Sequence, residues 1–157
     1  MNEYKRVLAA VDFSGYTKRI LEHAKTLAHC LDAELIVVSV INQREIDATY
    51  TAVNRLQKRD FHRISVQTAI ERLQAERKTD LASLKNEVDF NGVNVSFELR
   101  AGVPYKELME LIPKLKADLV VMGVKGRGEL ADVIVGSTAL KMFRRCPVPL
   151  VTVRERA

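Results

Sequence analysis

Leu119-Val120-Val121-Met122-Gly123-Val124-Lys125-Gly126-Arg127-Gly128 is the stretch that decides the fold. Its first four residues form a continuous apolar run, and its three glycines follow that run directly. Farther along, Gly136-Ser137-Thr138 opens a short amphipathic segment marked by Leu140 and Phe143. An apolar run, a glycine-rich loop and a helix start, in this order, predict a strand that passes through a loop into a helix.

Such a loop is suited to binding phosphate. Glycines allow backbone N–H groups to approach an anion closely, and a helix start adds unpaired donors and the positive end of the helix dipole. The hydroxyls of Ser137 and Thr138 can cap the helix or donate to phosphate oxygens. Lys125 and Arg127 can contact phosphate, or they can be solvated loop charges.

Four further apolar segments predict the remaining strands. Residues 6–12 and 34–41 are nearly unbroken apolar runs, which is typical of central strands covered on both faces. Residues 93–100 alternate apolar and polar side chains, as expected of a strand with one solvated face. Residues 148–153 contain Pro149, which favours an edge position. With the strands numbered along the chain, we predict an α/β fold with an open parallel five-stranded sheet in the order 3-2-1-4-5.

Helical periodicity between the strands predicts helices on both faces of this sheet, within a single domain over residues 1–157. The helices are expected at 20–31, 66–88 and 105–115 and around Leu140 and Phe143. Pro104 suits the first turn of the third helix, and Pro113 is expected to end or kink it. The segment from Asn42 to Arg63 is largely polar, so we expect it to be mobile or weakly helical and able to act as a lid.

The predicted strand order also predicts where a ligand binds. Chain direction reverses between strands 1 and 4, which leaves a crevice at their carboxyl ends, where open α/β sheets bind ligands. Asp12 ends the first strand and Gly123 ends the fourth, so the two residues are expected at one crevice. Asp12 can contact a ligand there, or it can cap a helix or stabilise a turn.

The glycine spacing resembles the nucleotide-binding signature of the universal stress protein family, in its ATP-binding subgroup. Two residues separate Gly123 from Gly126, and nine separate Gly126 from Gly136. The resemblance covers nearly the whole chain, because it extends to Val7–Asp12 with Ser14, Glu34–Ile41, Gly102-Val103-Pro104, Ala117–Gly126 and Cys146–Val153. It implies a Rossmann-like fold of the adenine nucleotide α-hydrolase type.

The resemblance also implies a role for each signature position. Asp12 would contact the ribose hydroxyls, and Val40 would bind adenine through its backbone. Ala10 and Val11 would flank the base, while Met122 and Gly123 would line the adenosine side. The phosphates would be held by Gly126, Arg127, Gly136, Ser137 and Thr138. We expect the ligand to be ATP, with Mg²⁺ or Mn²⁺ bridging its phosphates because loop dipoles and one or two cations neutralise a triphosphate only partly.

Composition narrows the class of protein. The two cysteines, Cys30 and Cys146, form no C-x-x-C pair, which favours a reducing compartment, and no apolar run approaches the roughly 18 residues of a membrane span. We therefore expect a cytoplasmic protein. The formal charge is +5 and the pI about 9.3, but the basic residues are scattered without interleaved aromatic residues. No nucleic-acid or membrane partner is expected.

Other motifs are incomplete. Residues 126–131 match G-x-G-x-x-A, but no acidic residue follows at the required distance, and no Walker A lysine follows Gly128. His23, His29 and His62 have no metal-site spacing, and no hydrolase nucleophile motif is present. An ATP-binding regulatory or stress-response module is the leading function. The alternatives are a slow ATPase or nucleotide-dependent enzyme using the same site, and a nucleotide-free interaction protein.

The last strand also predicts a partner. Leu150-Val151-Thr152-Val153 carries no charge that would discourage pairing at an exposed edge. Two copies related by a two-fold axis can align these strands antiparallel, which satisfies both edges. We therefore expect a homodimer through this strand, and the family resemblance implies the same arrangement.

Overall fold

The computed structural model describes residues 4–57, 65–125 and 135–154. In chain order, its elements are β1 (Arg6–Val11), α1 (Thr17–Leu31), β2 (Glu34–Asn42), α2 (Gln43–Gln57), α3 (Val66–Glu87), β3 (Val95–Gly102), α4 (Pro104–Lys114), β4 (Leu119–Gly123), α5 (Ser137–Arg145) and β5 (Leu150–Val153). The five strands form one parallel sheet in the order β3-β2-β1-β4-β5. This confirms the predicted fold class and strand order.

The unbroken apolar runs form the centre of the sheet. β1 pairs with β2 on one side and with β4 on the other. Because successive side chains point to opposite faces, Val7 and Ala9 belong to one hydrophobic cluster and Leu8 to the other, and all three are fully buried. A strand that contributes to two cores needs apolar residues at every position, which explains the absence of alternation.

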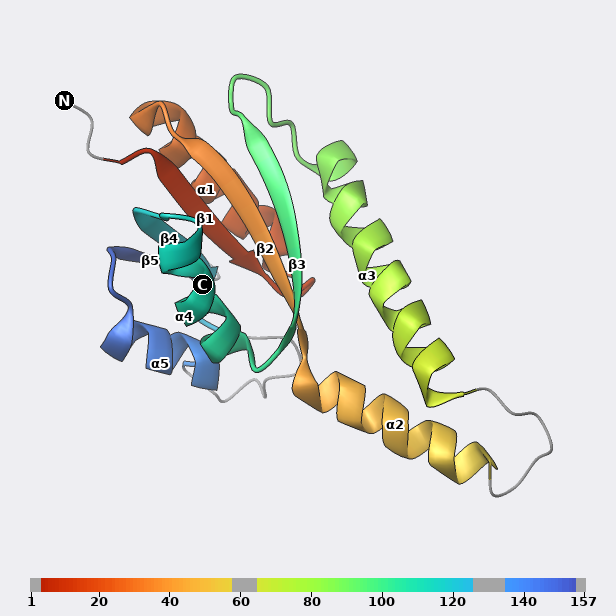
Figure 1. The fold of residues 1–157 in the computed structure, drawn as a ribbon. Coiled ribbons are helices and arrows are strands. Elements are labelled where there is room, and N and C mark those ends of the chain that lie inside the picture. Colours follow the sequence, from red (N-terminus) through yellow and green to blue (C-terminus); the bar gives the residue numbers. More distant parts are fainter. Residues whose placement is uncertain (1–3, 58–64, 126–134, 155–157) are drawn as a thin grey trace.

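Helices cover both faces, as Figure 1 shows. α1 and α3 pack against one face, and α4 and α5 pack against the other. The helical residues that make these contacts recur at the expected spacing: Ile20, Leu21, Ala24 and Ala28 in α1, Leu81 and Leu84 in α3, Leu108, Leu111 and Ile112 in α4, and Ala139 and Met142 in α5. α2 leaves the end of β2 and projects away from the sheet.

β3 and α4 differ in detail from the sequence pattern. β3 begins at Val95, two residues after the start of the alternating segment, and its odd-numbered residues Val95, Phe97 and Leu99 pack on the α1 and α3 side. The Phe97 ring meets the Phe90 ring edge-on, with centroids 6.1 Å apart. α4 ends at Lys114, one residue after Pro113, so the proline marks the end of this helix.

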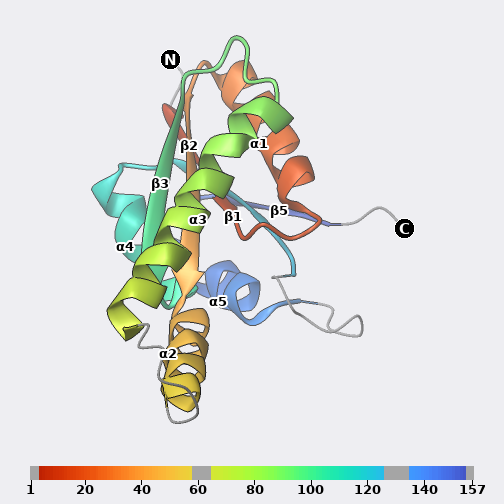
Figure 2. The same cartoon turned by 90° about the vertical axis from the view of Figure 1, so that its right-hand side faces the viewer.

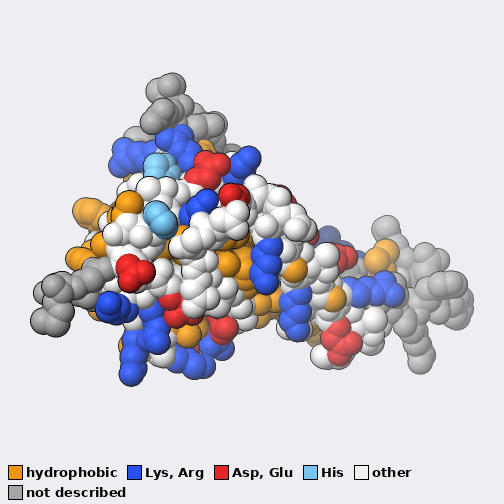
Figure 3. All heavy atoms as spheres, turned by 90° about the horizontal axis from the view of Figure 1, so that it is seen from above, with side chains coloured by type: hydrophobic (Ala, Val, Ile, Leu, Met, Phe, Trp, Pro, Cys, Tyr) orange, Lys and Arg blue, Asp and Glu red, His pale blue; other side chains and the backbone are white. Residues whose placement is uncertain are grey.

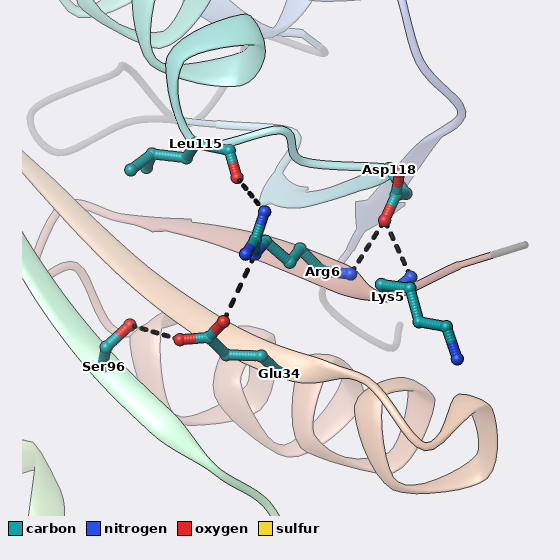
Figure 4. A network of polar contacts seen from close by, with 6 residues as sticks. All are labelled: Lys5, Arg6, Glu34, Ser96, Leu115 and Asp118. Carbon is teal, nitrogen blue, oxygen red and sulfur yellow. Dashed lines mark hydrogen bonds and ion pairs between the residues drawn. The ribbon is translucent and has the colours of Figure 1, made fainter.

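A polar network fastens the amino ends of the strands (Figure 4). One carboxylate oxygen of Asp118, just before β4, accepts hydrogen bonds from the backbone N–H groups of Lys5 and Arg6 at 2.7 and 2.9 Å. The Arg6 side chain in turn donates to Glu34 and to the carbonyl oxygen of Leu115. These contacts hold the start of β4 against the start of β1, and so support the parallel register of the two strands.

Charged side chains are dispersed over the face seen in Figure 3. Lys and Arg lie at several separate places on it, with Asp, Glu and uncharged surface between them. Within the described ranges, every helix is too short or too polar to cross a bilayer.

Candidate functional site

A cavity of about 450 Å³ opens at the carboxyl ends of β1 and β4. β2, α2, α3, α4 and α5 complete its wall, and Figure 2 shows α2 and α5 at this same end of the sheet. Ten of the twelve residues expected at the site lie on the wall: Ala10, Val11, Asp12, Val40, Met122, Gly123, Lys125, Gly136, Ser137 and Thr138. The other two, Gly126 and Arg127, fall outside the described residues.

The floor of the cavity is apolar and comes from adjacent strands. Ala10 pairs in register with Met122 on β4 and with Val38 on β2, and Val40 follows Val38 on the same face. The small Ala10 side chain between larger neighbours leaves room above β1 for a flat ring. Parallel pairing thus brings residues more than 100 positions apart into one surface.

Asp12 stabilises a turn, one of the two roles that the sequence left open, and it lies at the cavity, where the other role would place it. Its side chain lies on the cavity wall, and its Oδ1 accepts a hydrogen bond from the backbone N–H of Ser14 at 3.1 Å. The residue between them, Phe13, has a φ of 57°, a left-handed conformation that costs a bulky side chain about 1–2 kcal/mol. The turn after β1 is therefore held in one conformation that orients the carboxylate.

Gly123 is required by packing as well as by its place at the cavity. A Cβ at this position would lie 3.1 Å from Cδ1 of Ile20 and 3.3 Å from the carbonyl oxygen of Lys125. α1 packs closely against this end of β4, which explains why the apolar run ends in glycine.

The start of α5 faces the cavity. The helix begins at Ser137 after Gly136, and no side-chain hydrogen bond caps it, so the capping role considered for Ser137 and Thr138 is not observed. The first N–H groups of a helix have no acceptor within the helix, and the dipole is positive there. Lys125 and Lys141 also line this side, with the Lys141 ammonium 5.8 Å from the Tyr105 ring centroid. Lys141 is exposed and lies at the cavity.

On the part of the cavity wall that comes from α2, α3 and α4, the sequence had identified no site residue. This wall contains Asn42, Gln43, Arg44, Glu45 and Asp47 around the start of α2, together with Arg77 of α3 and Val103, Pro104, Tyr105 and Leu108 around the start of α4. The residues of α4 follow the Gly102-Val103-Pro104 motif, so their position at the carboxyl end of β3 was a usable signal. Arg77 carried no such sequence signal, because it lies in the middle of a long helix.

The segment after β2, expected to be mobile or weakly helical, forms the continuous 15-residue helix α2 over residues 43–57, and residues 58–63 of that segment lie outside the described residues. Its polar side chains bond along the helix: Gln43 donates to Asp47 at 2.9 Å, and the Thr49 hydroxyl donates to the Glu45 carbonyl oxygen at 2.8 Å. Val53 is buried, and Glu45 is paired with Arg77 on α3. Tertiary contacts thus stabilise a helix whose residues are mostly polar.

The described residues include no group of three His, Cys, Asp or Glu side chains that could hold a metal ion. Among those residues, the acids at the cavity are Asp12, Glu45 and Asp47, and the bases are Arg44, Arg77, Lys125 and Lys141.

Comparison with known proteins identifies relatives along the whole chain. The model of the universal stress protein family matches residues 3–154. Universal stress protein MJ0531 of Methanocaldococcus jannaschii is 28% identical over 154 residues, which cover 98% of this chain and 84% of that protein.

Solved structures show the same fold. The structure of MJ0577, also from Methanocaldococcus jannaschii, superposes with a TM-score of 0.76 at 24% identity and covers 98% of each chain. A universal stress protein in complex with cAMP has a TM-score of 0.59 at 21% identity, and covers 98% of each chain. One from Archaeoglobus fulgidus in complex with dAMP has a TM-score of 0.60 at 17% identity, and covers 97% of this chain and 98% of that one.

Proposed function

The chain belongs to the universal stress protein family, and from this premise we propose that its cavity binds ATP, with Mg²⁺ or Mn²⁺ bridging the phosphates, and that the protein acts as a nucleotide-dependent regulatory module. One observation carries the proposal: ten residues expected at a nucleotide site on sequence grounds line a single cavity at the switch point of the sheet. Complexes of two relatives with cAMP and dAMP support an adenine nucleotide as the ligand class.

The chemistry of the wall supports one orientation. The adenine ring lies on the apolar floor between Ala10 and Val40, where it is shielded from water, and Asp12 accepts hydrogen bonds from the ribose hydroxyls. The phosphates extend toward the start of α5, where unpaired N–H groups, the helix dipole and Lys125 favour negative charge. The cation is held chiefly by phosphate oxygens and adds charge neutralisation.

Two measurements test the proposal. Mass spectrometry of the small molecules released by denaturing freshly purified protein identifies any nucleotide that co-purifies. Calorimetry with ATP and MgCl₂, alongside GTP as a matched purine control, measures affinity and base selectivity. We expect ATP to bind more tightly than GTP; absence of binding to any adenine nucleotide contradicts the proposal and favours a nucleotide-free interaction protein.

A further inference from the structure

Arg77 is a buried cation on the cavity wall. Its side chain is only 5% exposed, although it lies near the middle of α3, outside every motif of the sequence. Arginine is almost never fully buried unless it is paired, because removing its charge from water is costly. A buried Arg77 side chain therefore needs groups nearby that pair with its charge.

Two partners from different parts of the chain hold the guanidinium. One of its terminal nitrogens, Nη2, donates to Oε2 of Glu45 at 2.8 Å, and its Cζ lies 5.3 Å from the centroid of the Phe13 ring. A planar guanidinium is suited to both contacts, since it can stack on an aromatic face while its N–H groups donate sideways. Arg77 thus joins α3, the third residue of α2 and the turn after β1.

Phe13 links the Arg77 guanidinium to the Asp12 carboxylate. The hydrogen bond from the Ser14 N–H to Asp12 Oδ1 spans Phe13, so the carboxylate direction depends on the backbone conformation of Phe13. That conformation, with a φ of 57°, is unfavourable for a phenylalanine and persists only where its surroundings hold it. The guanidinium against the ring is such a restraint.

We propose that Arg77 is a positioning residue that orients Asp12 through Phe13 and so sets how strongly the cavity distinguishes nucleotides with ribose hydroxyls from those without them. The inference rests on the proposed function, in which Asp12 meets the ribose. Glu45 serves the same end, because its carboxylate holds the guanidinium in place from α2.

The test compares ATP with 2′,3′-dideoxy-ATP by calorimetry in the presence of MgCl₂. In the wild-type protein, we expect the analogue to bind roughly tenfold more weakly, the usual effect of losing a hydrogen bond to a charged group. Arg77→Met keeps the aliphatic bulk and removes the charge, and should bring the two affinities within about twofold. Arg77→Lys retains the charge without the planar stack and should restore part of the difference.

The ratio of the two affinities separates positioning from general stability. A merely structural role would weaken both nucleotides equally, and an Arg77→Met protein with the wild-type ratio overturns the inference. Phe13→Gly provides a second variant, since it removes the ring but tolerates the left-handed backbone, and it too should lower the ratio. Wild-type protein that binds both nucleotides equally overturns the inference and the proposed contact between Asp12 and the ribose, but leaves ATP binding standing. Wild-type protein that binds neither nucleotide overturns the proposed function as well.

Discussion

The backbone N–H of Gly136 donates to the carbonyl oxygen of Val124 at 2.8 Å, while the N–H of Val124 donates to Val153 of β5 at 3.1 Å. The start of α5 is therefore attached to the end of β4 and, through it, to the sheet. These two hydrogen bonds hold the first turn of α5 at the cavity.

Gly136→Val should abolish ATP binding while changing the free energy of unfolding by only about 1 kcal/mol. Gly136 has an extended backbone, with φ −69° and ψ 159°, that valine also adopts, so the folding cost is mainly that of a poorer N-cap. The added side chain occupies the part of the cavity wall where the phosphates are proposed to lie. Calorimetry measures the loss of binding, and urea denaturation measures the stability.

Gly15→Val is the matched control. A Cβ at Gly15 meets no atom within 4 Å, and its φ is not in the positive range, so binding and stability should stay close to wild type. If the Gly136→Val protein binds ATP as tightly as the control, the phosphates lie elsewhere.

Lys141→Gln should weaken ATP binding about tenfold and AMP binding less than about twofold. Lys141 lies at the cavity one turn beyond Ser137, on the same side of α5, so we expect its ammonium to favour the outer phosphates over the first. Calorimetry with both nucleotides gives the ratio. Lys106→Gln is the control, because Lys106 is exposed on α4 and does not line the cavity; an equal loss in both variants would indicate only a long-range effect of charge.

Hydrolysis of ATP should be slower than about 1 per second, the lower end of ordinary enzyme turnover. Phosphoryl transfer needs a group that positions the attacking water, and the acidic side chains at the described part of the cavity are already engaged. Asp12 accepts from Ser14, Glu45 from Arg77 and Asp47 from Gln43. Phosphate release assays check the rate; faster turnover that disappears in Asp12→Asn would make the protein an ATPase.

The sheet was predictable because each strand carries its own local signal. The runs around Val7, Val37 and Val121 are nearly all apolar, as burial on two faces favours, and Pro149 marks an edge. The floor of the cavity follows from strand order, since Asp12 and Gly123 end strands that are neighbours in the sheet. Loop and strand-end positions could therefore be assigned before any contact was known.

The contact between Glu45 and Arg77 on the cavity wall was not predictable, because its signals are tertiary. Glu45 and Arg77 lie 32 positions apart on two polar helices, and neither side chain departs from what a solvated helix face would carry. Only the packing of α2 against α3 makes the arginine a buried group. Likewise, the left-handed conformation of Phe13 contradicts its side-chain preference and depends on neighbours far away in sequence.

Gly102→Ala should lower the free energy of unfolding by roughly 1–3 kcal/mol. Gly102 ends β3 with a φ of 149°, which side chains rarely adopt, and a Cβ there would lie 2.5 Å from Oε1 of Glu107. Urea denaturation measures the change, with Gly15→Ala expected within about 0.5 kcal/mol of wild type. The double variant Gly102→Ala, Glu107→Ala removes the contact, and a persisting loss would assign the cost to the backbone; full recovery would assign it to the glutamate.

A homodimer through β5 should form at micromolar concentration, and Thr152→Pro should split it. Hydrogen bonds from Val120 N–H to the Pro149 carbonyl oxygen, at 3.0 Å, and from Val124 N–H to that of Val153, at 3.1 Å, show that these residues face β4. Since backbone groups alternate in direction along a strand, Leu150 and Thr152 present theirs to the outer edge. Thr152 is exposed, so a proline there removes an outward donor without disturbing the ladder to β4.

Ala101→Pro is the control at the other edge of the sheet. Leu35 N–H donates to the Asn94 carbonyl oxygen at 2.8 Å, so by the same alternation the exposed Ala101 directs its N–H away from β2. Sedimentation velocity should show a dimer for the wild-type and Ala101→Pro proteins and a monomer for Thr152→Pro. A dimer that survives Thr152→Pro but dissociates in Ala101→Pro would move the interface to β3, and a monomeric wild-type protein would contradict pairing at either edge.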